Sequence, residues 1–443
     1  MPALSNGAGS VFLSNRPQLA RSVTDELQKC NRCGFCQTRC PVYRMTGREA
    51  SVARGHVARV SAAAEGEIPF EEVRESLFAC LMCRACTAEC PPAIQTDRVV
   101  FAARASYLAE RQSPIQRFLF REVLARPTLL RSGARMLGWL KRTRLTAFSR
   151  LLRALPWLDR GYSEAPAWMP APKTFLRERL APRGAPTAMT KRVLYFVGCA
   201  IDCAFPEMGE ATVDLLETAG CGVTVASNVC CGLPPYAYGD LDSARALAHK
   251  NMEALRARGS DAIITDCASC ASFLRDYPEL FEEGDPARAA AEEMAARVID
   301  LSQFLAEAEL PADLMSVNAA VTYHDPCHLS RYQGVTREPR ELLRSIPGLE
   351  YRELPEADWC CGGAGSYSMS HYDLSMQILE RKMGNIRSTG AAIVVTPCPA
   401  CIMQLRYGAD KFGVKVEVIH LSEMLRRALP AGRTEGGRAR APG

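Results

Sequence analysis

The stretch CNRCGFCQTRCP, residues 30–41, places four cysteines in the spacing C-x2-C-x2-C-x3-C and follows the last one with proline. The same spacing returns in CLMCRACTAECP, residues 80–91. Three thiolates at intervals of three residues can surround one face of an iron–sulfur cubane, and the proline directs the chain away from it. The two runs therefore predict two [4Fe–4S] clusters.

The fourth ligand of each cluster is expected to come from the other run, because the last cysteine is exchanged in chains that carry two such runs. We expect one cluster to be bound by Cys30, Cys33, Cys36 and Cys90, and the other by Cys80, Cys83, Cys86 and Cys40. Zinc is the alternative, since C-x2-C pairs also bind zinc, but the complete four-cysteine runs favour iron and sulfide.

The 39 residues between Cys40 and Cys80 exceed what a compact bacterial ferredoxin needs, and residues 49–64 have a helical pattern. We therefore expect residues 1–112 to form an α-helical ferredoxin-like domain. This domain resembles the module found in the iron–sulfur subunits of respiratory dehydrogenases.

The composition of the whole chain is that of a folded protein with more than one domain. Its 443 residues are 48% hydrophobic and 23% charged, so two or three domains are expected and wholesale disorder is not. No apolar run approaches the length of about 20 residues that spans a bilayer, and residues 1–21 lack the apolar segment of a secretory signal. Twenty cysteines then suit metal binding in a reducing cytoplasm better than disulfides.

Basic residues concentrate in a segment without cysteine, residues 113–190, which we interpret as a helical and then proline-rich connector. Residues 114–155 hold ten Lys or Arg and one acid, a local charge of +9, so the rest of the chain carries 5 − 9 = −4. A uniformly basic surface for nucleic acid is therefore not predicted.

The helical pattern of residues 116–155 mixes basic and large apolar side chains and has two interpretations. It suits the surface of an anionic membrane, such as the inner membrane, where it could approach quinone. It also suits a bridge that packs on its own domains or on a partner subunit. Pro127 and Gly133 interrupt the amphipathic face, which favours the bridge.

The remaining cysteines form a repeat. Cys199, Cys230, Cys267 and Cys270 are followed by Cys327, Cys360, Cys398 and Cys401 at offsets of 128, 130, 131 and 131 residues. Each unit closes on a similar phrase, VIDLSQFL at residues 298–305 and VIHLSEML at residues 418–425. We expect two domains of one design, at residues 191–310 and 311–430, with a flexible tail at 431–443.

Short runs rich in β-branched residues alternate with helical patterns in both units, which predicts an α/β fold. The expected strands are residues 192–197, 223–226, 262–265, 320–323 and 392–396, and the expected crossover helices are residues 210–218, 243–256 and 372–386. Cys199, Cys267, Cys327 and Cys398 directly follow strands. Ligands of such sheets collect at the carboxyl ends of the strands, so loops from one sheet edge are expected to meet at a single site.

Both units resemble the CCG family of cysteine-rich domains, whose pattern is one cysteine, a Cys-Cys-Gly and a Cys-x-x-Cys. The matching cysteines are Cys199, Cys230, Cys231, Cys267 and Cys270 in the first, and Cys327, Cys360, Cys361, Cys398 and Cys401 in the second. The resemblance implies two Rossmann-like domains, each with a further iron–sulfur cluster. That cluster could be a noncubane [4Fe–4S] assembly or a cubane, and structural zinc is the third alternative. Cys203 and Cys221 are left over, and Cys203 could assist Cys199.

The order of the motifs, over residues 25–428, resembles the iron–sulfur subunit of glycolate oxidase and its relatives in lactate utilisation. The resemblance implies an electron-transfer subunit of a flavin-dependent oxidoreductase that acts on 2-hydroxy acids such as glycolate or D-lactate. An FAD-containing partner would supply the electrons, and quinone or another acceptor would take them. The alternative is a catalytic subunit that reduces disulfides at noncubane clusters, as in heterodisulfide reductase.

Two histidines flank Cys327, namely His324 and His328. Each could bind metal, but a histidine beside a thiolate more often forms a hydrogen bond next to the centre. Asp266 and Asp325, which precede motif cysteines, are expected to orient loops.

Overall fold

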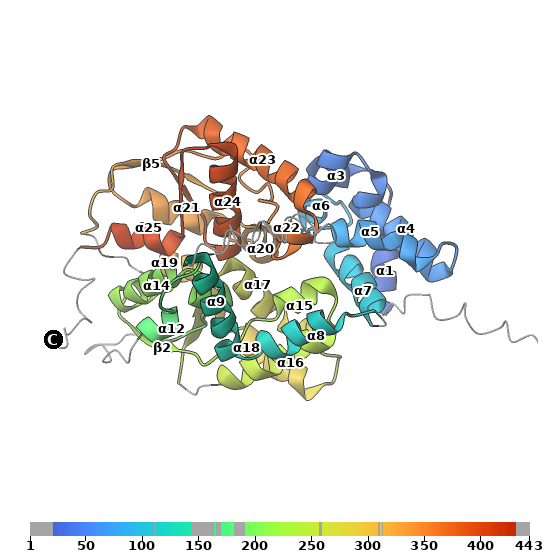
Figure 1. Cartoon of the computed structure of the whole chain (residues 1–443), viewed down its shortest axis with the longest axis horizontal. Coiled ribbons are helices and arrows are strands. Elements are labelled where there is room, and N and C mark those ends of the chain that lie inside the picture. Colours follow the sequence, from blue (N-terminus) through green and yellow to red (C-terminus); the bar gives the residue numbers. More distant parts are fainter. Residues whose placement is uncertain are drawn as a thin grey trace, which may run out of the picture. The chain divides into compact units, whose positions relative to one another are not determined.

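We describe the protein from a computed structural model, which covers residues 21–109, 111–142, 164, 170–180, 191–256, 259–308, 311 and 313–430. The predicted tail and much of the proline-rich connector lie outside these residues. The chain divides into two compact units, one of residues up to 113 with 236–240, the other of residues 114–235 and 241 onward (Figure 1). We describe each unit by itself.

The first unit is helical, as predicted, and no strand occurs among its described residues. Its α-helices are α1 (Arg21–Gln28), α2 (Phe35–Arg39), α3 (Pro41–Thr46), α4 (Ala53–Glu65), α5 (Phe70–Ala79), α6 (Ala85–Ala88) and α7 (Thr96–Leu108), with a 3-10 turn at Glu49–Ser51. Apolar faces of α1, α4, α5 and α7 form its core. The predicted helix at 49–64 is thus a 3-10 turn followed by α4.

The second unit begins with helices of the basic segment. They are α8 (Pro114–Phe118), a π-helical turn (Leu119–Val123), α9 (Pro127–Arg142) and, further on, α12 (Leu176–Arg179). Residues 143–155 of the predicted helical segment fall outside the described part. Pro127 begins α9 rather than interrupting it, because proline lacks the N–H that the first helical turn leaves unpaired.

Two four-stranded parallel sheets follow, one in each cysteine-rich domain. The first consists of β1 (Lys191–Tyr195), β2 (Cys221–Val225), β3 (Ala262–Thr265) and β4 (Val298–Asp300), in the order β2-β1-β3-β4. The second consists of β5 (Ala319–Tyr323), β6 (Leu349–Tyr351), β7 (Ile393–Val395) and β8 (Glu417–Ile419), in the order β6-β5-β7-β8. The predicted fold class, a helical ferredoxin-like domain followed by two α/β domains, is confirmed.

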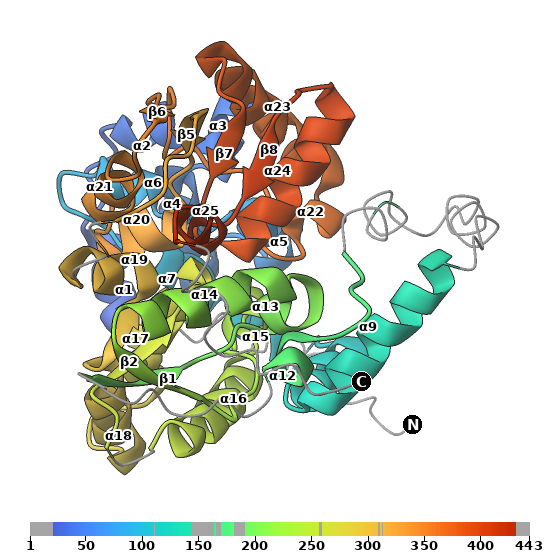
Figure 2. The same cartoon turned by 90° about the vertical axis from the view of Figure 1, so that its left-hand side faces the viewer.

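Helices cover both sheets (Figure 2). In the first domain they are α13 (Cys199–Ala204), α14 (Pro206–Thr218), α16 (Leu241–Ala254), α17 (Ala268–Arg275), α18 (Pro286–Ala295) and α19 (Leu301–Glu307). Helix α15 (Leu233–Tyr238) begins in this domain, and its residues from 236 onward belong to the helical unit. In the second they are α20 (Cys327–Gln333), α21 (Arg337–Arg344), α22 (Tyr367–Ser370), α23 (Tyr372–Thr389), α24 (Pro399–Phe412) and α25 (Leu421–Arg427). The three predicted crossover helices correspond to α14, α16 and α23.

The two domains share one hydrophobic core. Buried residues of β1, β3 and α19 belong to the same cluster as residues of β5, β7 and α25. Helix α14 packs against α25, and α19 against α21. The hydroxyl of Ser422 also donates a hydrogen bond of 3.0 Å to the carbonyl of Met208. The repeated phrases of the sequence form the last strand and the last helix of each domain, at this shared core.

Among the described helices, none combines the length and the apolar character that crossing a bilayer would require.

Candidate metal centres

The two N-terminal cysteine runs adopt similar backbone conformations. In the first, Arg32 and Gly34 have positive φ angles of 53° and 90°, and in the second Met82 and Arg84 have 50° and 55°. Left-handed residues between successive cysteines bend the chain sharply, and this is unfavourable for residues other than glycine. Strain repeated at matching positions indicates a conformation that a bound group stabilises.

Each of the two predicted ligand sets lines one cavity of the helical unit. The first cavity, with about 380 Å³ of space, is lined among others by Cys30, Cys33, Cys36 and Cys90. The second, with about 400 Å³, is lined among others by Cys40, Cys80, Cys83 and Cys86. Cys86 also lines the first cavity. The structure therefore groups Cys90 with the first run and Cys40 with the second, and four soft sulfur donors at each cavity fit a [4Fe–4S] cluster.

The thiols of these cavities are poorly suited to ionise without metal. Burial raises the pKa of Cys40, Cys80 and Cys86. Backbone amides partly oppose this, because Tyr43 N–H points at Cys40 Sγ over 3.5 Å and Met82 N–H at Cys80 Sγ over 3.4 Å. A metal ion favours the thiolate outright, so we expect these buried thiols to ionise on metal binding.

In the cysteine-rich domains, the motif cysteines lie where the strand order reverses. Strands β1 and β3 are neighbours, with β2 and β4 on their outer sides. Cys199 begins α13 shortly after β1, and Cys267 is the N-cap of α17 after β3. Cys327 and Cys398 occupy the same places in the second domain. The predicted convergence of loops at one sheet edge is thus observed, at the position where open α/β sheets bind ligands.

The glycine after each cysteine pair has a conformational reason. Gly232 and Gly362 have φ angles of 96° and 80°. A Cβ on Gly362 would also lie 2.8 Å from the carbonyl oxygen of Ser375. The N–H of Gly362 points back at Cys360 Sγ over 3.4 Å, so the turn directs a backbone amide at sulfur.

Five sulfurs form a continuous series in each domain. In the first domain the series runs in the order Cys199, Cys230, Cys231, Cys270, Cys267. In the second it runs in the order Cys327, Cys360, Cys361, Cys401, Cys398. The first contact is 3.8 Å, between Cys199 Sγ and Cys230 Sγ, and the distance from Cys361 Sγ to Cys401 Sγ is 3.5 Å. All ten cysteines predicted from the CCG pattern are thus brought together in two sets.

Hydrogen bonds within each series favour a thiolate at one cysteine of the adjacent pair. Those from Cys230 and Cys270 lower the pKa of Cys231 to about 6. Those from Cys327 and Cys361 hold the pKa of Cys360 well below its usual range. Thiolates are the metal-binding form of cysteine, so both donor sets fit a metal centre. The chemistry of all-sulfur sets suits iron–sulfur clusters as well as zinc.

The two leftover cysteines are not members of these series, although the charge of the nearby Cys199 contributes to the raised pKa of Cys203. Cys221 begins β2, and its sulfur is 4.0 Å from the carbonyl oxygen of Ala219. Cys203 lies on α13, where burial raises its pKa to about 12. Neither is in the series of hydrogen-bonded sulfurs.

The Cys-x-x-Cys motifs of the two domains meet each other. Ser269 Oγ lies 3.6 Å from Cys398 Sγ, and the amide of Ala268 donates to the carbonyl of Pro397 over 3.1 Å. A hydrogen bond from Cys270 lowers the pKa of Cys267, but burial raises it, and a charge on Cys398 raises it further. Groups bound by the two series would therefore influence each other electrostatically.

The aspartates before motif cysteines orient loops, as expected. Asp325 accepts two hydrogen bonds from Arg340, of 2.9 and 2.7 Å. Asp266 accepts from Tyr195 Oη and Thr212 Oγ1 over 2.7 and 2.6 Å. The partners of these aspartates have no local signal in the sequence, because they come from other elements.

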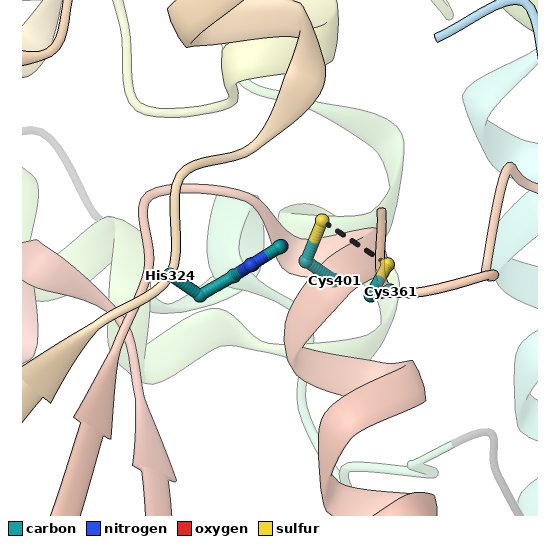
Figure 3. Close-up of side chains that lie close together, drawn as sticks. All are labelled: His324, Cys361 and Cys401. Atoms are coloured by element: carbon teal, nitrogen blue, oxygen red, sulfur yellow. Dashed lines mark hydrogen bonds between the residues drawn. The ribbon is translucent and has the colours of Figure 1, made fainter. Parts of the chain in front are cut away.

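The two histidines beside Cys327 differ in their surroundings. His328 lies 3.4 Å from Cys327 Sγ through its Nδ1, which fits the hydrogen-bonding role expected from the sequence. His324 is buried close to Cys361 and Cys401 (Figure 3). Burial, with the nearby Lys382, lowers the pKa of His324 to about 3, so its ring is neutral.

Comparison with known proteins identifies the families of the domains. Residues 26–94 match the 4Fe-4S dicluster domain family, and residues 193–275 and 321–406 match the cysteine-rich domain family. Over 94% of the chain, the fold is similar to that of a hypothetical protein from Helicobacter pylori, with a TM-score of 0.52, 10% identity and 75% of that chain covered.

Several curated relatives match nearly the whole chain, including two from Methanothermobacter marburgensis and Bacillus subtilis. One is a subunit of the CoM/CoB fumarate reductase of Methanothermobacter marburgensis, which is 29% identical over 91% of this chain and 72% of its own length. The other is the probable glycolate oxidase iron-sulfur subunit of Bacillus subtilis, which is 34% identical over 91% of this chain and 94% of its own length. At this identity and coverage, and with a dicluster domain followed by two cysteine-rich domains, the chain belongs to the glycolate oxidase iron–sulfur subunit family.

Proposed function

We propose that this protein is the electron-transfer subunit of a flavin-dependent oxidoreductase that oxidises a 2-hydroxy acid of the glycolate or D-lactate type. The proposal rests on one observation, which is that a single chain of this family contains four groups of cysteines. Two are sets of four, in which the last cysteine comes from the other run, and two are series of five. An FAD-containing partner subunit delivers the electrons, and quinone or another acceptor receives them. The proposed domains are residues 1–112, 191–310 and 311–430, joined by the connector at 113–190.

The residues of this chain provide four sites that bind and tune redox groups. Iron–sulfur clusters supply one-electron transfer when bound. Amides such as those of Tyr43, Met82 and Gly362 point at sulfur and stabilise its negative charge. The neighbouring Cys-x-x-Cys motifs place two of the sites in one unit, which supports transfer between them.

We place the protein in the cytoplasm, with the basic segment as a bridge within the complex. Arg131 donates to Asp202 over 2.8 and 2.9 Å, and Arg135 pairs with Glu178. These guanidinium groups therefore bind the protein's own carboxylates, which favours the bridge over membrane attachment. Phe118, Met136 and Trp139 remain more than half exposed, so the same segment still offers apolar surface to a partner subunit or to a peripheral membrane contact.

A second candidate is direct reduction of disulfides at the five-cysteine series. The relative from a CoM/CoB fumarate reductase favours it, as does the complete second series. The candidates differ in their need for a flavoprotein. Turnover of a heterodisulfide with reduced viologen, by this chain alone, would support the catalytic alternative and contradict a role limited to electron transfer.

The test of the main proposal uses the full chain, purified and loaded with iron and sulfide without oxygen. It is mixed with the flavoprotein subunit of a 2-hydroxy-acid oxidase, and visible absorption is followed after addition of glycolate or D-lactate. We expect bleaching of the cluster absorption only when flavoprotein and substrate are both present. A preparation that contains zinc but negligible iron would refute the proposal.

A further inference from the structure

His324 lies at the sulfur series of the second domain without being part of the CCG cysteine pattern. One ring nitrogen of His324 and the sulfurs of Cys361 and Cys401 all lie within 4.8 Å of one another. All three residues are buried, and the ring points from the loop after β5 toward the two sulfurs (Figure 3). A buried imidazole beside two thiols is a donor set that metals such as iron and zinc accept.

A backbone carbonyl fixes which nitrogen faces the sulfurs. His324 Nδ1 lies 3.2 Å from the carbonyl oxygen of Ala357, which also accepts from Lys382 Nζ over 3.1 Å. A carbonyl can only accept, so Nδ1 carries the proton and Nε2 carries a lone pair. Nε2 is buried and has no hydrogen-bond partner among the described residues. This is the arrangement of a metal-binding histidine, whose other nitrogen donates to a carbonyl.

The spacing of the sulfurs is consistent with one shared metal ion. Two thiolates bound to the same tetrahedral ion at about 2.3 Å lie about 3.8 Å apart. Cys361 Sγ and Cys401 Sγ are 3.5 Å apart.

The first domain lacks this nitrogen donor. Phe196 is the residue 128 positions before His324, at the same offset that separates Cys199 from Cys327, and it also follows the first strand of its domain. Phe196 is fully buried and cannot bind a metal. The five sulfurs are therefore repeated in both domains, whereas the imidazole occurs only in the second.

We propose that His324 Nε2 binds an iron of the cluster in the second cysteine-rich domain, alongside Cys361 and Cys401. The inference rests on the proposed function in that the bound group contains iron. Iron–sulfur centres with imidazole ligands have higher potentials than those with thiolate ligands alone. The centre of the second domain then has a higher potential than that of the first, so electrons that reach the two domains collect in the second.

The test detects the nitrogen directly. Full-length protein is made with 15N-labelled histidine, loaded with iron and sulfide, reduced and examined by pulsed EPR. We expect a strong hyperfine coupling from a directly bound histidine nitrogen, which changes between 14N and 15N material. The coupling is lost in His324→Phe, which copies the first domain, and in His324→Cys, which offers a thiolate in place of the imidazole. In His324→Cys the potential of that centre should also fall.

His328→Phe is the matched control, since His328 lies next to Cys327 but should not bind iron, and it should keep the coupling. A coupling that persists in both His324 variants, or its absence from iron-loaded wild type, would overturn the inference while leaving the proposed function intact. An absence of iron from the second domain, shown by unchanged iron content in Cys401→Ser, would instead count against the proposed cluster and against His324 as its ligand. Far-UV circular dichroism confirms that each variant is folded.

Discussion

The two cysteine-rich domains keep the same strand order and the same series of five sulfurs, but their buried polar groups differ. Three differing positions are Phe196 and His324, Asn251 and Lys382, and Asp300 and His420, with the first-domain residue given first in each pair. Sulfur spacing decides whether a centre can be bound, whereas neighbouring charge and hydrogen bonds tune it. The comparison indicates that both domains kept the sulfurs that bind a metal centre, whereas the buried groups that would tune the potential of that centre diverged.

Asn251 and Lys382 illustrate the divergence. Asn251 Nδ2 donates to the carbonyl of Cys230 over 2.9 Å. Lys382 Nζ is buried and donates to the carbonyls of Glu356 and Ala357 over 2.6 and 3.1 Å. Burial lowers the pKa of Lys382 to about 8, so the second domain contains a cation at neutral pH where the first has an amide. A nearby cation favours the reduced form of a centre, in the same direction as an imidazole ligand.

The largest expected effect comes from breaking one sulfur series at a time. Cys270→Ser and Cys401→Ser each replace the second cysteine of a Cys-x-x-Cys motif, and each should remove the metal of its own domain. If all four sites hold clusters of four irons, each variant loses roughly a quarter of the iron. Iron and acid-labile sulfide per chain measure the loss.

The matched control for these two variants is Cys221→Ser, which changes a buried cysteine outside both series and should leave the iron content unchanged. Loss of both domains' iron in either motif variant would show that the two series form one interdependent centre, contrary to the comparison.

The next effect concerns the buried aspartates near Cys199 and Cys327. Asp202 binds Arg131 of the connector, and its Oδ1 accepts from the amide of Arg177 over 3.1 Å. Asp202→Asn leaves a largely buried guanidinium without its carboxylate, and we expect a loss of about 3–5 kcal/mol in the free energy of unfolding. Asp325→Asn should cost less, about 1–3 kcal/mol, because Glu353 still accepts from Arg340 over 2.8 Å. Urea unfolding compares the two.

An exposed ion pair serves as the reference for both aspartates. Glu417 and Arg427 are each 40% exposed or more, so Glu417→Gln should change the free energy of unfolding by less than about 1 kcal/mol. If Asp325→Asn were as destabilising as Asp202→Asn, the second contact to Glu353 would not compensate, and the proposed difference between the domains would be wrong.

Local sequence determined much of the fold because cysteine spacing and strand composition are short-range signals. The first three strands along the chain were predicted to within two residues at each end. Strands β4, β6 and β8 were not predicted. Each has three residues, and none is completely buried along its length. The equally short β7 was predicted because all three of its residues are buried and apolar. A short, partly exposed run gives no such signal, and its pairing with β3, β5 or β7 decides that it is a strand.

The sites were predictable to the extent that they consist of cysteine motifs. The grouping of Cys90 with the first run and of Cys40 with the second followed from a general rule for such runs. The roles of Lys382 and Arg340 had no such signal in the sequence. Lys382 donates to the carbonyl of Ala357 and Arg340 to the carboxylate of Asp325, and each does so from a helix outside the cysteine motifs. His324 was noticed for its place near Cys327, but its lone pair and its distance from Cys361 depend on the tertiary structure.

The smallest expected effect concerns Asp300 and His420, the N-cap residues of α19 and α25. The contributions of these two residues to protein stability should change with pH in opposite directions. Asp300 accepts from the amide of Ser302 over 2.8 Å, and its other oxygen has no partner among the described residues. Burial raises the pKa of Asp300 from 3.8 to about 6. His420 Nδ1 accepts from the amide of Ser422 over 3.1 Å, and burial lowers the pKa of His420 below 6.5.

The pKa of Asp300 is higher in the folded than in the unfolded state, so its contribution makes the protein less stable as pH rises from about 4 to 6. The pKa of His420 is lower in the folded state, so its contribution makes the protein less stable as pH falls below 6.5. Asparagine keeps the capping oxygen at either position and does not titrate. When the pH is raised from 5.5 to 7.5, Asp300→Asn should therefore gain about 1 kcal/mol of stability relative to wild type, whereas His420→Asn should lose stability relative to wild type. Urea midpoints at the two pH values measure both. His420 Nε2 also donates to the carbonyl of Asp266 over 2.8 Å, so His420→Asn should be less stable than wild type at pH 7.5. If the stability of both variants, relative to wild type, changed with pH in the same way, the two caps would not differ in titration.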